Sequence, residues 1–524
     1  MSTFVYPSED ELLEAFYSGE IDFIQLVTLQ EIIRNGIDSS NIFLLDEIPN
    51  LSYFFELRRD EKSELVKEQA APYLEEKSAP GPVRVRLSHY LTTELEDEGD
   101  SRYRSGGEIN LKQGLKAAFR LHREYSGVER FVYRKLEYRP QNGALKRLVL
   151  GNYTTRLGLG TIIGYRGKLL DFSEEIDGES ILFPDYGGYN GIQAQIKKGN
   201  SEVETVFSQT RDCDFAIRTI GGSFGLKKKI FSPSVILSMT ILENRSSDES
   251  INDFKYGLNF HSKYANGYNE LEISAQSGEE SSFGAFLTEG GHLFGRGKVD
   301  YSLWIYSDKF WDLTAGSKAA SIRMINEIEE VDFSYSDKRS GQEGGLFKTT
   351  VELSENLDFI NSLIYAQRDQ DDYNFEFLSA MEKHISSKTT LRLDHISRVK
   401  HRLESGGESE DTFRRSRMEL RLINPEFYVR TYLAYQSKTD EDDYSSFFTN
   451  VRYKSERTGE LSLWFNLGEF RHNEGRVDYW YGFVENRMEL FENLKSVAKI
   501  THSYRRSRPD EHVSTASLGI ELAI

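Results

Sequence analysis

Residues 427–435 read Phe-Tyr-Val-Arg-Thr-Tyr-Leu-Ala-Tyr, with mainly apolar side chains at the odd-numbered positions and an arginine among the even-numbered ones. Successive side chains of a β-strand point to opposite faces of a sheet, so this stretch predicts a strand with one apolar and one more polar face. The same alternation occurs at 461–467, at 477–484 and at 516–524. Most of the chain from residue 83 onward follows this period of two, which predicts a β-protein.

The composition narrows the class of protein. The chain has 524 residues and a formal net charge of −19, with 38% hydrophobic and 28% charged residues. No apolar run reaches the roughly 20 residues of a spanning helix, so a helical membrane protein is excluded. The 13% of aromatic residues argue against disorder. The single cysteine, Cys213, allows no intrachain disulfide and no multi-cysteine zinc site.

The connections between the alternating stretches themselves alternate in length. The expected long or acidic ones are 505–512, 438–444, 404–411, 368–372 and 245–253, and the short ones include 491–493, 456–459, 424–425, 386–388 and 232–233. Tight turns at one end and longer loops at the other are typical of outer-membrane barrels. At roughly 18 residues per strand and connection, about 24–26 strands are expected. About twenty-one of them follow Tyr189, counting a weak one near 319–326, whereas 108–125 and 145–164 show no clear pattern.

The polar face decides between a membrane barrel and a soluble sheet fold. It is rich in Arg, Glu, Asn, Ser and Tyr, which is too polar for the packed core of a sandwich. A closed barrel pairs every strand edge and places one face in lipid and the other in water. Solenoids and propellers need a repeat of roughly 20–50 residues, and none recurs. We therefore expect a mainly β fold, a large antiparallel transmembrane β-barrel of about 24–26 strands over residues 83–524.

Residues 1–82 are expected to form a small α-helical domain that ends at the linker Ala79–Pro82. The pattern around Pro49 is like that of a helix-hairpin-helix unit, but Asn50 and Ser52 stand where DNA-binding hairpins carry glycine. The region also has 17 acidic against 6 basic residues. This charge balance argues against nucleic acid as a partner and disfavours DNA uptake.

The chain resembles a group of Gram-negative outer-membrane barrel proteins that begin with a helix-hairpin-helix-like region. The resemblance rests on 6–13 and 47–49 in the helical lead, and on 147–153, 156–160 and Gly164 near the start of the barrel. It implies an outer-membrane location, but no substrate and no reaction. The sequence as given begins without the basic and apolar regions of a secretory signal, so we expect a mature or trimmed form of an exported protein.

One set of polar-face residues is a candidate channel lining. It spans three neighbouring strands and comprises Arg417, Glu419, Arg421, Tyr428, Arg430, Tyr432 and Arg452. Neighbouring basic side chains in a narrow pore favour anions and orient dipolar solutes. The alternative is that these arginines pair with lumenal acids only to satisfy a wet wall. The tyrosines could offer stacking surfaces to sugars, and the sequence leaves these alternatives open.

No catalytic or metal-binding arrangement is expected. The histidines are scattered, and the acidic loops match no defined calcium loop. Residues 221–225 read Gly-Gly-Ser-Phe-Gly, but they continue an alternating strand and lack the strand-to-helix turn of a nucleophile elbow. We expect these glycines to make room for a neighbouring element. The chain is therefore expected to be no enzyme and to need no cofactor and no metal.

These observations lead to two hypotheses about function. The first is an outer-membrane channel or transporter for small polar or anionic solutes, with residues 1–82 or 169–188 filling part of a wide lumen. The second is a non-transporting surface or assembly anchor whose helical domain binds a periplasmic protein. Outer-membrane lipid, lipopolysaccharide and the barrel-assembly machinery are the other expected partners.

Overall fold

The computed structural model describes residues 4–5, 56–57 and 84–523, the last range with internal gaps. The gaps fall at 96–100, 112–113, 124–128, 141, 165–180, 184–187, 212–214, 229, 246, 248, 265–266, 278–280, 295, 311–313, 315–340, 370–371, 387, 405–406, 425–426, 440–442, 456–458, 472–475, 492 and 506–512. Phe4–Val5 (β1) and Glu56–Leu57 (β2) pair as a short antiparallel sheet. The helices expected elsewhere in 1–82 lie outside the described residues and stay predictions. No helix in the described part of the chain is long and apolar enough to cross a membrane.

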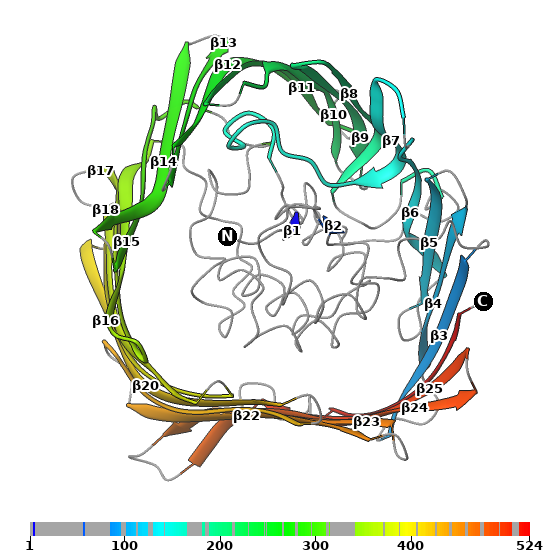
Figure 1. Ribbon diagram of the computed structural model, residues 1–524, viewed down its shortest axis with the longest axis vertical. Helices are drawn as coiled ribbons and strands as arrows, with labels where there is room; N and C mark the ends of the chain where they lie inside the picture. The colour runs from blue at the N-terminus through cyan, green and yellow to red at the C-terminus, as the bar shows by residue number, and fades with distance from the viewer. Residues whose placement is uncertain are drawn as a thin grey trace.

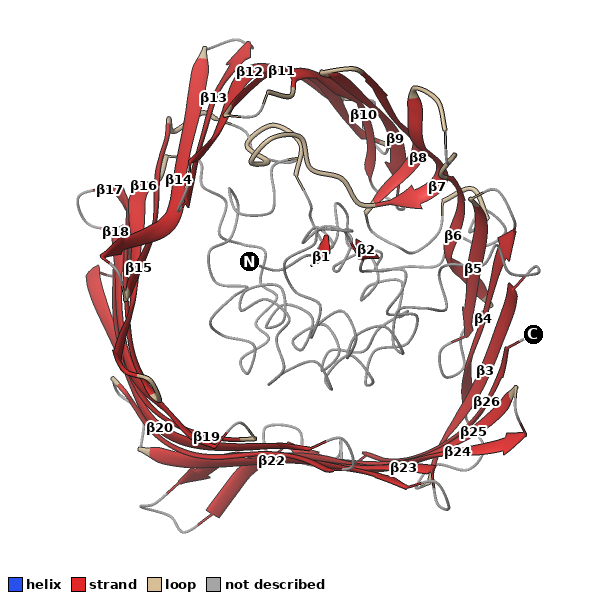
Figure 2. Ribbon diagram, in the orientation of Figure 1, coloured by secondary structure: helices blue, strands red, loops and turns tan. Residues whose placement is uncertain are grey.

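The remaining strands form one closed antiparallel barrel (Figure 1, Figure 2). Each strand from β3 to β26 pairs with its neighbours in the chain, and β26 closes the ring by pairing with β3. This ring of twenty-four strands confirms the expected large barrel, at the lower end of the expected range. The bounds are β3 Arg84–Glu94, β4 Ser101–Leu111, β5 Leu115–Arg123, β6 Arg130–Tyr138, β7 Leu145–Tyr153, β8 Tyr189–Lys198, β9 Ser201–Arg211, β10 Phe215–Leu226, β11 Phe231–Asn244, β12 Ser250–Tyr264, β13 Gly267–Ser277, β14 Ser282–Phe294, β15 Gly297–Tyr306, β16 Glu343–Ser354, β17 Leu357–Asp369, β18 Asp372–Ser386, β19 Thr389–Glu404, β20 Gly407–Asn424, β21 Phe427–Lys438, β22 Tyr444–Ser455, β23 Gly459–Arg471, β24 Arg476–Phe491, β25 Leu494–Arg505 and β26 Val513–Ala523.

The distribution of strands along the chain differs from the expectation. Nineteen described strands, β8 to β26, lie from Tyr189 onward, fewer than the twenty-one expected, and five barrel strands precede them. The strands are longer than assumed, and β20 alone has 18 residues. The weak strand expected near 319–326 lies outside the described residues.

The two faces of the barrel wall differ in polarity, as the alternation predicts. Large apolar side chains are exposed on the outer face around the ring, among them Leu91, Phe207, Leu237, Leu258, Leu303, Phe377, Leu433, Leu463 and Leu518. Buried polar side chains occupy the inner face, among them Thr92, Thr240, Lys255, Glu272, Asp394, Glu419 and Asn450. An apolar outer face around a closed sheet is stable only in contact with lipid. The fold is that of a barrel that crosses a membrane.

The two ends of the barrel differ in the length of their connections. Because the number of strands is even, β3 begins and β26 finishes at the same end, which we call the terminal end. Its connections are short turns such as 199–200 and 355–356. The two longest connections, 154–188 and 307–342, both belong to the opposite end, the loop end. The expected alternation is thus confirmed: short connections lie at the terminal end and the longest ones at the loop end.

The prediction of a long acidic loop at 404–411 is wrong. The strands β19 and β20 continue to Glu404 and Gly407, with only a two-residue connection between them. Lys400 lies directly opposite Asp411 in this extension. Opposite charges on facing positions stabilise antiparallel pairs, so the acidic residues extend a strand instead of forming a loop.

The short turn expected at 232–233 is also misplaced. Both residues lie inside β11, and the connection falls earlier, at 227–230. Pro233 lies just beyond the last pair of the β10–β11 ladder, Gly225 with Ser234. Its missing N–H therefore costs no hydrogen bond to β10, which is where a strand tolerates proline.

The pairing is shortest between β6 and β7. In the described residues four pairs join these strands, from Lys135–Gly151 to Tyr138–Leu148, whereas sixteen join β19 and β20. The cause is that the end of β7 turns away from the wall toward the interior (Figure 1). The Asn152 side-chain oxygen there accepts a hydrogen bond from the Arg134 N–H at 2.8 Å, so a side chain replaces one bond of the ladder.

Candidate functional site

After β7 the chain enters the barrel instead of turning back at the rim. Residues 154–164, which we call the inward segment, run along the inner wall beside β7 to β11 (Figure 2). Most of the segment is buried, and Leu159 packs with Phe286 and Trp304 of the wall. The other apolar side chains of the segment belong to a second cluster: Val149, Tyr153, Leu157, Ile162, Ile163, Tyr189, Val206, Ile217 and Ile236. The region 145–164 showed no clear pattern because it is half strand and half inward segment.

Two wall glycines make room for the inward segment. A Cβ at Gly221 would lie 2.5 Å from Cδ1 of Ile163, and a Cβ at Gly257 would lie 2.8 Å from Cδ1 of Ile162. Each Cβ would also lie close to a backbone carbonyl oxygen of the next strand, that of Leu237 at 2.9 Å and that of Ile273 at 2.8 Å, so both positions favour glycine. The expectation that the glycines of 221–225 accommodate a neighbouring element is confirmed at Gly221.

Substituting Gly221 tests this contact. We expect Gly221→Val to lower the free energy of unfolding by about 1–3 kcal/mol, because the added side chain overpacks the site. The readout is the temperature at which the fast-migrating folded band is lost on a gel. Ile163→Ala in the same chain should recover part of the loss, because the contact with the Leu237 carbonyl oxygen remains, and Ser223→Val, on the same face of β10, is the control. Equal melting of the two valine variants would contradict the contact.

Glu272 of β13 holds the tip of the inward segment. Its buried carboxylate accepts hydrogen bonds from the backbone N–H groups of Leu159 and Thr161, the latter at 3.0 Å, and from the Thr161 hydroxyl. Gly158 adopts a φ of +62°, and a side chain there would overlap the Glu272 carboxylate. A buried N–H group is costly to leave without an acceptor, and this one side chain serves two of them. Glu272 is therefore the main polar anchor of the segment.

The two ends of the inward segment are anchored as well. The Thr155 hydroxyl donates to the carboxylate of Glu204 at 2.8 Å. The Gly164 N–H donates to the carbonyl oxygen of Thr314 at 2.8 Å, and the Thr314 hydroxyl donates to the carbonyl oxygen of Ile162 at 2.7 Å. Thr314 belongs to the connection 307–342. The two long connections of the loop end therefore meet inside the barrel and fix each other there.

The charged candidate residues of β20 and β21 meet on the inner wall across the ring from the inward segment (Figure 1). The buried carboxylate of Glu419 binds Arg430 through both oxygens, at 3.1 and 3.0 Å, and also binds Arg421. Arg417 lies 3.6 Å from Glu419 and 2.8 Å from Asp394 of β19. We call these five residues the arginine cluster. Paired, two-point contacts of this kind fix both geometry and charge.

The remaining candidates lie against arginine side chains. The guanidinium carbon of Arg417 is 5.5 Å from the ring centre of Tyr432, and that of Arg452 is 5.8 Å from the ring centre of Tyr428. These are cation–π distances. Tyr432 is 6% exposed, so its ring packs in the wall and is a poor stacking surface for a sugar.

Sequence reasoning missed the partners contributed by neighbouring strands. Asp394 and Arg392 of β19 contact each other at 3.2 Å, and Arg392 lies 3.7 Å from Glu382 of β18. No local sequence signal marks Asp394, because only the register of β19 and β20 places it directly opposite Arg417. The arginines pair with acidic side chains of the wall, which is the alternative to an open anion-binding lining that the sequence left open. The local balance is nevertheless positive, since four arginines, Arg392, Arg417, Arg421 and Arg430, contact the three carboxylates of Glu382, Asp394 and Glu419.

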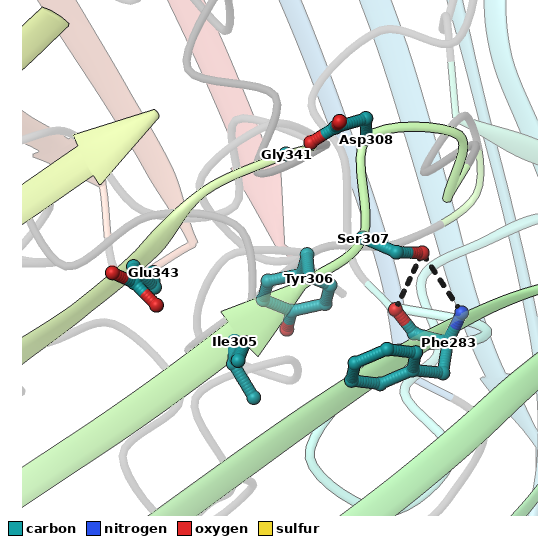
Figure 3. Close-up of a pocket in the computed structure, with 7 residues that line it drawn as sticks. All are labelled: Phe283, Ile305, Tyr306, Ser307, Asp308, Gly341 and Glu343. Carbon is teal, nitrogen blue, oxygen red and sulfur yellow. Dashed lines mark hydrogen bonds between the residues drawn. The ribbon is translucent and has the colours of Figure 1, made fainter. Parts of the chain in front are cut away.

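A shallow recess at the loop-end rim is the other concave feature near the long connections (Figure 3). It is lined by Phe283, Ile305, Tyr306, Ser307, Asp308, Gly341 and Glu343. The Ser307 hydroxyl bonds the backbone of Phe283, accepting from its N–H at 2.9 Å and donating to its carbonyl oxygen at 3.2 Å. Across the described ranges, no group of three or more His, Cys, Asp or Glu residues could hold a metal ion.

Comparisons with known proteins add a likeness in structure. No family model matches the chain, and no curated protein matches it. Among solved structures, the siderophore receptor PirA from Pseudomonas aeruginosa is similar at 7% identity and a TM-score of 0.49, over 85% of this chain and 80% of that one. The copper transporter OprC matches at 8% identity and a TM-score of 0.43, over 85% and 81%. The FrpB iron transporter from Neisseria meningitidis matches at 8% and 0.43, over 85% and 82%.

Proposed function

We propose that this chain is an outer-membrane channel or transporter for small polar or anionic solutes. The observation that carries the proposal is the arginine cluster on the inner wall, where arginines outnumber carboxylates. In a lumen bounded by low-dielectric walls, an excess of fixed positive charge raises the local concentration of anions. The inward segment occupies part of the lumen on the opposite side of the ring.

The ion selectivity of the purified full chain in planar bilayers tests the proposal. In a KCl gradient we expect a reversal potential that corresponds to preference for chloride over potassium, because the fixed charge is positive. Raising the salt concentration on both sides should weaken the preference, since charges separated by more than a Debye length of about 3 Å at 1 M are screened. Cation preference would contradict the proposal.

A barrel that inserts but never conducts would favour the alternative, a surface or assembly anchor that binds a periplasmic protein. Both oxygens of Glu419 are bonded to Arg430, as they would be in a wall with a purely structural role. This pairing is the observation that favours the alternative. Lipid, lipopolysaccharide and the barrel-assembly machinery are proposed partners under both functions.

A further inference from the structure

Arg415 of β20 differs from the arginines beside it. It faces the interior, two residues from Arg417, and is only 5% exposed. Its Nε is buried without a hydrogen-bond partner. Within the described part of the chain, it makes no ion pair and no ring contact. Enclosing a guanidinium without a counter-charge is costly, so this arrangement needs an explanation.

Two acids on the neighbouring strands bind other arginines, and the unpaired Oδ1 of Asp394 makes no contact with Arg415. On β19, Asp394 binds Arg417 at 2.8 Å. On β18, Glu376 binds Arg398 at 2.8 Å. The two positions directly opposite Arg415 are uncharged, because the register places Ile396 on one side and Gln436 on the other. No protein group in this part of the wall neutralises Arg415.

The neighbouring strand β21 adds further donors at the same height. The amide oxygen of Gln436 accepts the Tyr444 hydroxyl at 3.1 Å, and the amide nitrogen donates to the Ser446 hydroxyl at 3.2 Å, so the side chain of Gln436 is held in place. Lys438 is the next inward position on β21, with its Nζ 5.9 Å from the ring centre of Tyr444. Cationic and amide donors therefore gather on one side of the arginine cluster.

We propose that Arg415, Gln436 and Lys438 form a subsite for an oxyanion, the phosphate or carboxylate group of a small solute in the lumen. The planar guanidinium binds such groups through two parallel hydrogen bonds, and the lysine adds a second positive charge. A bound oxyanion supplies the counter-charge that the wall lacks. The role of the subsite in transport rests on the proposed function, but binding itself needs no conducting pore.

Inorganic phosphate is the probe, and the full chain in detergent is the sample. Phosphate at constant ionic strength should raise the temperature at which the folded gel band of the wild type is lost, relative to chloride. In Arg415→Gln the phosphate concentration needed for the same rise should increase at least about tenfold, because the two-point contact is lost. Arg415→Lys keeps the positive charge but loses the planar two-point contact. Its phosphate response should therefore lie between those of the wild type and Arg415→Gln. Arg414→Gln, one residue away and exposed on the outer face, should behave as the wild type.

Folding of the key variant is checked in phosphate-free buffer. There Arg415→Gln should unfold at or above the wild-type temperature, because an uncompensated buried charge is removed. The subsite is overturned if phosphate does not stabilise the wild type, or stabilises Arg415→Gln equally. Channel activity is decided separately by the reversal potential. A phosphate response that depends on Arg415 in a barrel that never conducts would keep the subsite and overturn the channel.

Discussion

Replacing Glu272 by leucine is expected to release the inward segment and raise single-channel conductance. The substitution removes the carboxylate that accepts the N–H groups of Leu159 and Thr161. Each buried N–H group left without an acceptor costs about 1–3 kcal/mol, so the loss of this carboxyl group destabilises the bound segment. The tip of the segment should therefore leave the wall and seek water, which widens the path at mid-height of the barrel.

Two measurements check this expectation on the full chain. Single-channel recording reports the conductance, and limited proteolysis within residues 154–164 reports release of the segment directly. Glu272→Gln should give a smaller change, because one oxygen remains as an acceptor. The matched comparison is Glu270→Leu, on the same face of β13: its carboxylate contacts Asn259 at 3.2 Å and lies near Arg156 of the segment, but it accepts no backbone N–H from the tip, so a smaller change is expected. Wild-type conductance and proteolysis in Glu272→Leu would show that packing alone fixes the segment.

Replacing Glu419 by glutamine is expected to change both selectivity and stability. Three arginines would lose their shared carboxylate, which leaves uncompensated positive charge on the inner wall. Breaking a buried ion pair by removing one partner costs about 3–5 kcal/mol. The same excess charge should shift the reversal potential further toward anions.

The control for the change in charge is Glu410→Gln. Glu410 lies on the same strand, but its side chain is exposed at the loop-end part of β20. It changes the net charge equally and should leave selectivity and melting temperature near wild type. An unchanged reversal potential in a folded Glu419→Gln barrel would place the arginine cluster outside the conduction path.

Much of the fold follows from the sequence because the alternation of side chains directly reports the two environments of a barrel wall. Leu433 and Tyr435 are exposed on the outside, while Arg430 and Tyr432 face inward, as the pattern at 427–435 predicts. Strand boundaries were harder to place, since the charges of 404–411 fit either a loop or a pair of strands. Lys400 pairs with Asp411 in the structure, so these residues form strands. This pairing depends on the neighbouring strand and cannot be read from the local sequence.

The candidate site was predictable only in part for the same reason. The register brings Arg421 opposite Arg430 and Tyr428 opposite Arg452, so residues chosen by face do come together. Their ion-pair partner Asp394 lies on another strand, and nothing in its local sequence marks it. The inward segment was not predictable, because residues 154–164 lack a period and contact wall positions such as Glu272 more than a hundred residues away.

The short pairing between β6 and β7 makes the barrel mechanically uneven. A ring of strands has no free edge, so thermal opening must begin by separating two neighbours, and the pair that shares the fewest bonds separates at the lowest cost. Backbone amides along Lys135–Tyr138 should accordingly exchange with deuterium earlier than those of β19 and β20. The chain leaves the wall at the end of β7, and the seam between β6 and β7 is thus also where the barrel is expected to open first.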